Sequence, residues 1–165
     1  MKVRTDMDTF MGLHSPARFR VEPDTARGVT YITLSGFFLL PDVAAFDREW
    51  AQAHALLRCA PNAHLTLCDI SDMSIQSQDV VNAFTTIVRD PVRQGRRLAM
   101  VVGMSLSRHQ AKRLNPPDRE GVAHFFSRAE AEAWLFSDDR TDAQYRHAPA
   151  SPMSADHGYI GPSAA

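Results

Sequence analysis

The chain has 165 residues, which suits one domain with a hydrophobic core of ordinary size. Apolar residues make up 44% and charged residues 22% of it, and its net charge of -1 gives no field that favours nucleic acid or an anionic membrane. Because no apolar run is long enough for a transmembrane helix and the first residues lack the apolar centre of a secretory signal, we expect a cytoplasmic protein without stable membrane anchoring.

The two ends of the chain differ from its middle. Residues 1–16 show no sustained periodicity, and residues 138–165 are rich in Ala, Ser, Pro and Asp. Such a composition buries too little apolar surface to offset the entropy cost of ordering. The sequence therefore predicts an N-terminal extension (1–16), a folded domain (17–137) and a loosely ordered C-terminal tail (138–165).

The domain opens with two segments in which apolar and polar residues alternate. They cover residues 18–21 and 29–35, and the second is rich in β-branched and aromatic residues. The sequence PDTARG at 23–28 between them is typical of a turn. These segments predict a β-hairpin.

Helical and strand patterns alternate along the rest of the domain. Asp42 can cap a helix that ends before Pro61, Ser77 can cap a second helix, and Ser127 with Glu130 matches a capping box at the last helix. The other expected elements are strands at 64–70, 97–103 and 122–126 and a short polar helix at 105–114.

The predicted order of elements is β-β-α-β-α-β-α-β-α. Strands that alternate with helices need crossover connections, which favour a parallel sheet covered by helices. The nearly continuous apolar run RLAMVVG (97–103) is typical of a central strand that is buried on both faces. We therefore expect an α/β fold with a mixed, mostly parallel sheet of four or five strands and one antiparallel edge from the hairpin.

Four stretches of the sequence carry a resemblance to a known family. They are VTYITLSG, LTLCDIS, RLAMVVG and HFFSRAEAEAWL. With this layout, residues 19–137 resemble the STAS family of anti-sigma-factor antagonists, and in particular its stand-alone SpoIIAA-like branch with SEC14-like relatives. The resemblance implies a STAS fold and a non-enzymatic module that acts through protein–protein contacts.

In the partner-switching members of that family, a serine at the start of the helix after the third strand accepts phosphate. The Asp-Ile-Ser sequence at 69–71 fits the first part of the family pattern, but the later Ser-Gly signature is missing here and the acceptor position falls on Asp79. A serine kinase cannot phosphorylate Asp79. Ser74 and Ser77 are the alternative acceptors; in the competing interpretation Ser77 caps the helix, while Ser71 and Ser74 satisfy backbone groups of the loop.

Ligands of open parallel sheets commonly sit beyond the carboxyl ends of the strands. The binding rim that we expect there consists of Asp69, Ser71, Ser74, Ser77, Asp79 and Ser105. Asp69 could act as a general base, or it could cap a loop or pair with an arginine. Ser105 lies in GMSLS, a partial match to a nucleophile elbow in which Ser107 replaces the second glycine, so a helix cap explains it better. We assign no catalytic residue and no cofactor.

Basic residues cluster in the second half of the domain. Arg89, Arg93 and Arg96 share one helical side if the helix extends that far, and Arg108 and Lys112 share another. They form either a solvated face or a patch for an anion or a partner. Without interleaved exposed aromatic residues, single-stranded nucleic acid is not the expected ligand.

Histidine and cysteine give no sign of a metal site. The seven histidines show none of the spacings of metal ligands. The two cysteines, Cys59 and Cys68, are too few for a disulfide scaffold, and Cys68 lies in an apolar strand, where cysteine packs as a small hydrophobe. We therefore expect no metal.

Three functions remain open, and we expect the first. It is a regulatory or binding module that contacts an unknown protein partner or a second copy of itself as a homodimer. The second is a carrier of a small apolar ligand or lipid, which needs a cavity lined by residues such as Phe37, Phe38, Leu39, Leu40 and Trp50. The third is a small hydrolase-type enzyme that uses Asp69 or Ser105.

Overall fold

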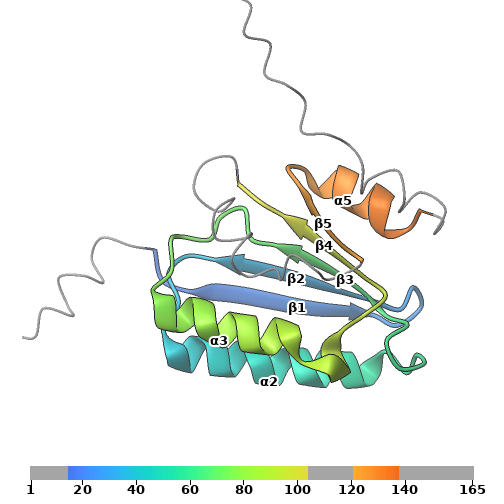
Figure 1. The fold of residues 1–165 in the computed structure, drawn as a ribbon, viewed down its shortest axis with the longest axis horizontal. Helices are drawn as coiled ribbons and strands as arrows, with labels where there is room; N and C mark the ends of the chain where they lie inside the picture. The colour runs from blue at the N-terminus through green and yellow to red at the C-terminus, as the bar shows by residue number, and fades with distance from the viewer. Residues whose placement is uncertain (1–14, 104–120, 138–165) are drawn as a thin grey trace, which may run out of the picture.

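The computed structural model describes residues 15–103 and 121–137 (Figure 1). Most of the predicted N-terminal extension, the predicted helix at 105–114 and the predicted C-terminal tail lie outside the described residues. The predicted rim residue Ser105 and the predicted basic residues Arg108 and Lys112 lie outside them too.

A five-stranded sheet forms the centre of the described part of the chain, and its strands follow one another in chain order. β1 pairs with β2 in the antiparallel direction, and each later neighbour pairs in parallel. The strands are β1 (Arg18–Asp24), β2 (Val29–Ser35), β3 (Leu65–Asp69), β4 (Arg97–Val101) and β5 (Val122–Phe125). This arrangement confirms the α/β fold class with a mostly parallel sheet and one antiparallel edge.

Helices cover both faces of the sheet (Figure 1). α2 (Leu40–Leu56) and α3 (Gln78–Arg89) lie on one face, and α5 (Arg128–Leu135) lies on the other; a short 3-10 helix, η1 (Pro91–Arg93), follows α3. Phe46, Trp50 and Phe84 lie in the core on the α2 and α3 side. The core on the α5 side is smaller and includes Leu67 and Trp134.

Two predicted boundaries differ most from the structure. α2 begins at Leu40 rather than after Asp42, and the Asp42 carboxylate lies inside its first turn, where it accepts the backbone N–H of Leu39 at 2.8 Å. Pro41 favours this early start because proline suits the first turn of a helix. β1 also runs through Pro23 to Asp24, although PDTARG predicts a turn there; an edge strand tolerates proline. The predicted caps Ser77 and Ser127 are confirmed.

Arg97 is the largest side chain that is fully buried in the described residues. It points to the α5 face, where its guanidinium donates to the carbonyl oxygens of Trp134 at 2.7 Å and Ser137 at 2.6 Å. A cation is favourable at the carboxyl end of a helix. Arg97 therefore connects α5 to the sheet.

Within residues 15–103 and 121–137, no helix combines the length and the apolar character that crossing a membrane requires.

Candidate functional site

The described residues of the predicted rim lie between the carboxyl end of β3 and the first turn of α3. Asp69 ends β3, and the loop from Ile70 to Ser77 leads from there into α3. The Ile70 N–H donates to the Val101 carbonyl oxygen at 2.9 Å, which holds the start of the loop against β4. The rim is therefore built on strand ends whose positions the sheet fixes.

Gln76 fastens this loop to the segment that follows β2. Its side chain is buried, its Oε1 accepts the Phe38 N–H at 2.8 Å, and its Nε2 donates to the carbonyl oxygens of Gly36 at 2.9 Å and Ser74 at 2.6 Å. Buried amides that make all these bonds specify one loop geometry. Gln76 could not be predicted from the sequence, because a polar residue inside a loop carries no periodic signal that it is buried.

Gly36 is the second element of this connection. Its N–H donates to the Asp72 carbonyl oxygen at 3.1 Å, and its carbonyl oxygen accepts the Ser74 N–H at 3.1 Å. Its φ of +77° lies in the left-handed region, and a Cβ at this position would lie 2.1 Å from the carbonyl oxygen of Pro16. The rim thus depends on a glycine at the point where three backbone segments meet.

The polar residues of the predicted rim have different roles. The Asp69 carboxylate accepts both the N–H of Ser71 at 3.0 Å and its hydroxyl at 2.7 Å, which agrees with the loop-capping interpretation. The Ser77 hydroxyl accepts the Val80 N–H at 3.5 Å and caps α3. Asp79 is exposed in the first turn of that helix, where the helix dipole favours a carboxylate.

Three large apolar side chains are exposed beside the rim. They are Leu39, Leu40 and Ile75, which are 37%, 51% and 52% exposed. Leu39 follows Phe38 and Ile75 precedes Gln76, so the hydrogen bond between Phe38 and Gln76 holds the two segments together. We call Leu39, Leu40 and Ile75 the apolar rim patch.

The space beneath this patch is filled by the core. Phe38 and Trp50, two of the residues expected to line a carrier cavity, are buried, and their aromatic neighbours Phe84 and Phe46 lie at ring-centroid distances of 5.4 and 5.6 Å respectively. The cavity between the sheet and the two helices has a volume of about 30 Å³. Sites for small organic ligands commonly measure roughly 300–1,000 Å³. This cavity is therefore too small for a lipid or a cofactor.

Cys68 faces the same core, one residue before the rim. Burial, together with the negative charge of Asp69 beside it, raises the pKa of the Cys68 thiol from 9.0 to about 12. A thiol that stays protonated is a poor nucleophile. Cys68 is partly buried and packs against the core, which agrees with the prediction that it packs as a small hydrophobe.

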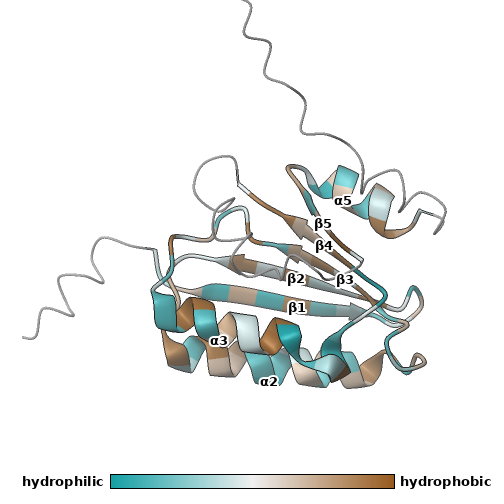
Figure 2. Ribbon diagram, in the orientation of Figure 1, coloured by the Kyte–Doolittle hydropathy of each residue, from teal (hydrophilic) through white to brown (hydrophobic). Residues whose placement is uncertain are grey.

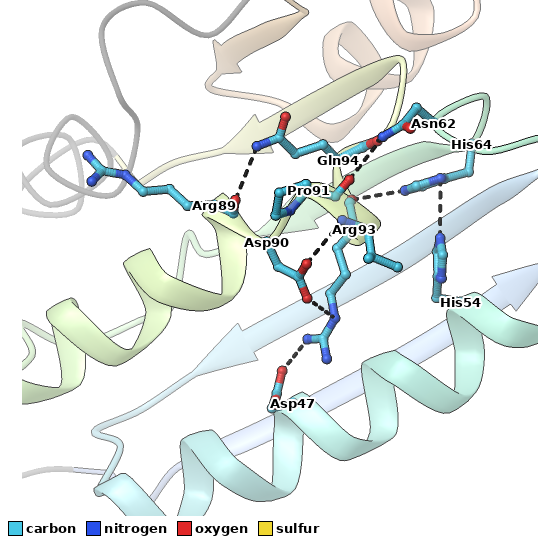
Figure 3. A network of polar contacts seen from close by, with 10 residues as sticks. Asp47, His54, Asn62, His64, Arg89, Asp90, Pro91, Arg93 and Gln94 are labelled. Carbon is cyan, nitrogen blue, oxygen red and sulfur yellow. Dashed lines mark hydrogen bonds and ion pairs between the residues drawn. The ribbon is translucent and has the colours of Figure 1, made fainter.

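A second polar cluster lies toward the amino end of β3, around η1 (Figure 3). The Arg93 guanidinium forms an ion pair with Asp47 on α2 and lies 3.7 Å from the Asp90 carboxylate. His64 is buried; one ring nitrogen lies 3.0 Å from the Arg93 carbonyl oxygen and the other 3.4 Å from a ring nitrogen of His54. These contacts connect η1 to α2 and to the start of β3.

This cluster corrects the prediction that Arg89, Arg93 and Arg96 lie on one helical side. α3 ends at Arg89, because Asp90 leaves helical geometry before Pro91, and Arg93 lies in η1 instead. The Arg93 side chain is 13% exposed and paired with carboxylates, whereas Arg89 and Arg96 are exposed. The patch that residue spacing indicated therefore does not form as a continuous surface of these three residues.

Two hollows flank the cluster at the surface. One of about 530 Å³ is lined by residues that include Asp47, Arg89 and Arg93, and one of about 400 Å³ includes His54 and Cys59. Among the residues that the structure describes, no group of three or more His, Cys, Asp or Glu side chains is placed to hold a metal ion. Neither hollow therefore presents such a group of metal ligands among the described residues.

Comparison with known proteins identifies the fold. No family model and no curated protein sequence matches this chain. In a comparison of structures, the chain is similar to an uncharacterized protein of the DUF3478 family from Shewanella loihica PV-4, whose crystal structure has a SpoIIAA-like fold. The match has a TM-score of 0.56 and 14% sequence identity, and it covers 73% of this chain and 96% of that protein. The chain has a SpoIIAA-like fold, as the sequence resemblance implies.

Proposed function

We propose that this protein is a non-enzymatic regulatory module that binds a protein partner through its apolar rim patch. One observation carries the proposal: Leu39, Leu40 and Ile75 are exposed on backbone that the Gln76 side chain and Gly36 hold in place. Exposed apolar side chains on a fixed scaffold are typical of protein contact surfaces. A preformed surface also loses little conformational entropy when it binds.

The size of the core cavity supports a protein partner over a small apolar ligand. A bound lipid would need about ten times the volume of the cavity under the rim, which measures about 30 Å³. A partner protein needs no internal cavity, because it can cover the patch from outside. The proposal therefore assigns recognition to the surface of the domain.

Ser77 supplies a route for regulation at this surface. Its side chain is exposed at the start of α3, two residues from Ile75. A phosphate there would place nearly two negative charges beside the apolar rim patch, and these charges would oppose burial of Ile75 against an apolar partner. Ser74 is half-buried and its carbonyl oxygen accepts the Gln76 side chain, so Ser77 is the more accessible of the two serines.

The proposal is tested by affinity purification of the tagged full-length chain from its own host, with quantitative mass spectrometry of the retained proteins. Leu40→Glu and Ile75→Glu each place a charge in the patch. Leu56→Glu is the matched control, because Leu56 is 54% exposed at the other end of α2. A partner lost with both rim variants and retained with Leu56→Glu supports the proposal. Equal retention by all the variants contradicts it.

A further inference from the structure

β1 lies at one edge of the sheet in the described part of the chain, and its outer backbone groups face away from β2. The Gly28 carbonyl oxygen accepts the Leu65 N–H of β3 at 2.9 Å. Because backbone N–H and C=O groups alternate in direction along a strand, those of the even-numbered β2 residues point to β3. Those of the odd-numbered β2 residues point to β1. The β1 residues that pair with the odd-numbered ones are Arg18, Arg20, Glu22 and Asp24. The N–H and C=O groups of Phe19 and Val21 therefore point outward from the sheet.

The side chains of β1 divide by face. Phe19 and Val21 point to the core beneath α2, and Phe19 contacts Phe46 with ring centroids 5.8 Å apart. The charged side chains point to the other face, where α5 covers β3, β4 and β5. Figure 2 shows β1 as largely hydrophilic, in contrast to the more hydrophobic β4. Arg20 and Glu22 form an ion pair at 2.6 Å, and their side chains remain 73% and 52% exposed.

The charges of β1 are arranged with opposite signs about Val21. Arg18 and Arg20 precede it, and Glu22 and Asp24 follow it, at equal separations on the two sides. A strand with this pattern is complementary to itself in the antiparallel direction. A two-fold axis at Val21 would set Arg20 opposite Glu22 of the second copy, and Arg18 opposite Asp24 of the second copy.

We propose that β1 is a dimerisation edge, at which it pairs in antiparallel with β1 of a second copy of this chain, centred on Val21. The two Val21 residues would exchange N–H···O=C bonds across the axis, and the N–H of each Phe19 would donate to the Pro23 carbonyl oxygen of the other copy. The two sheets would join into one continuous sheet with an isologous two-fold interface.

The charge pattern selects this register over its neighbours. The two β1 strands would bond through the outward N–H and C=O groups of their odd-numbered residues. If the two-fold axis moves by one residue along the strand, odd-numbered residues still face odd-numbered residues, so the hydrogen bonds also permit these neighbouring registers. A shift toward the N-terminus sets the two Arg20 side chains opposite each other, and a shift toward the C-terminus does the same for the two Glu22 side chains. Like charges directly opposite each other destabilise a strand pair. The register centred on Val21 is the one that pairs opposite charges throughout.

Pro23 fits the same arrangement. It has no N–H, and its place in β1 is one at which the backbone nitrogen faces away from β2, so the pairing with β2 loses no hydrogen bond. In the proposed dimer its carbonyl oxygen still accepts a bond, while the missing N–H limits how far the ladder extends. Because the interface uses β1, it leaves the apolar rim patch free, and the two proposals can fail independently.

The test uses charge reversal at the two most exposed positions, with sedimentation velocity of the full-length chain over a range of concentrations. Arg20→Glu would set a carboxylate opposite Glu22 of the second copy, and Glu22→Arg would set a guanidinium opposite its Arg20. We expect the wild type to dimerise, and each variant to bind itself at least about tenfold more weakly. Arg48→Glu is the matched control, since Arg48 is exposed on α2.

Mixing the two variants gives the sharper result. In a mixed dimer, positions 20 and 22 are both positive in the Glu22→Arg copy and both negative in the Arg20→Glu copy. Opposite charges therefore face each other again. We expect an equimolar mixture of Arg20→Glu and Glu22→Arg to form dimers, and the double variant with both exchanges to dimerise alone. Slower hydrogen exchange of the Val21 amide at high protein concentration is expected for the wild type.

Three outcomes would overturn the proposal. A wild-type chain that stays monomeric at all concentrations would show that the charges and Pro23 keep the edge from pairing. A dimer that both charge reversals leave intact would place the interface elsewhere. Variants that lose dimerisation and do not restore it when mixed, although circular dichroism shows that they fold, would contradict the pairing of Arg20 with Glu22.

Discussion

Phe38 and Gln76 are separated by 38 positions in the chain, and a hydrogen bond of 2.8 Å joins the backbone N–H of the first to the side-chain oxygen of the second. This bond holds the segment that leads into α2 against the loop that leads into α3. The same amide also bonds the carbonyl oxygens of Gly36 and Ser74. One buried side chain thus sets the shape of the rim on which the proposed function depends.

Removing that amide is expected to destabilise the fold. Gln76→Leu keeps the approximate volume but leaves the Phe38 N–H without its acceptor and the Ser74 carbonyl oxygen without the side-chain donor, whereas the Gly36 carbonyl oxygen keeps the Ser74 N–H. Each unmet buried group costs about 1–3 kcal/mol. We expect the free energy of unfolding in urea to fall by about 2–4 kcal/mol. Gln78→Leu is the control, since Gln78 is exposed and bonds Asn82; a similar loss for both variants would contradict the assignment.

Alanine substitutions at two glycines with positive φ distinguish the stability cost of backbone strain from the stability cost of a steric clash. Gly28 and Gly36 have φ of +64° and +77°, but a Cβ on Gly28 meets no atom within 4 Å, whereas one on Gly36 lies 2.1 Å from the Pro16 carbonyl oxygen. We expect Gly28→Ala to lower the free energy of unfolding by about 1 kcal/mol and Gly36→Ala to lower it by several times as much. Equal losses in thermal denaturation would show that the segment at Pro16 yields to the added methyl group.

The order of the strands and helices that the structure describes could be predicted from the sequence, because each of them carries its own periodic signal. The helix predicted at 105–114 lies outside the described residues. Val43, Phe46 and Trp50 recur at helical spacing, and RLAMVVG is an apolar run of strand length. The start of α2 is harder to predict from the sequence. Asp42 lies inside the helix and accepts the N–H of Leu39. From the sequence alone, an aspartate in this position cannot be distinguished from one that caps the helix from outside.

The local bonds at the end of β3 and at the start of α3 could be predicted, but the residues that hold the loop between them could not. Asp69 and Ser77 follow from general rules for strand ends and helix starts, and both have the local bonds expected of them. Gln76 and Gly36 act through contacts with segments distant in the chain, which no local pattern reveals. The same limit applies to Arg93, whose partner Asp47 lies 46 positions away.

The Cys68 thiol is expected to make stability depend on pH in the alkaline range. Its pKa rises from 9.0 in an exposed setting to about 12 in the folded protein, so above pH 9 the unfolded chain loses the proton while the folded chain keeps it. The free energy of unfolding then falls with rising pH, by about 1.4 kcal/mol per unit between these two values.

This contribution is isolated by comparison with Cys68→Ala. The alanine variant lacks the titrating thiol, so the stability advantage of the wild type over it should shrink as the pH rises from about 9 toward about 11. Cys59→Ala is the matched control, because it removes a cysteine that is exposed. A wild-type advantage that stays constant over this range would show that the thiol ionises equally in both states.

The ion pair between Asp47 and Arg93 is expected to contribute modestly to stability. It joins α2 to η1, and the two side chains are 38% and 13% exposed, so water screens one side of the pair. A double-mutant cycle with Asp47→Ala and Arg93→Ala should give a coupling energy of about 1 kcal/mol that decreases at high salt. Additive effects of the two substitutions would show that the pair does not connect the elements energetically.

Site-specific photocrosslinking at Ile75 tests the central claim most directly. A photoreactive amino acid replaces Ile75 in the full-length chain inside its host, and a second chain carries it at Leu56, which is similarly exposed but distant from the rim. The account predicts a discrete adduct with one partner protein from position 75 and no such adduct from position 56. No adduct from position 75, or the same adducts from both positions, would contradict the claim that the rim binds a protein.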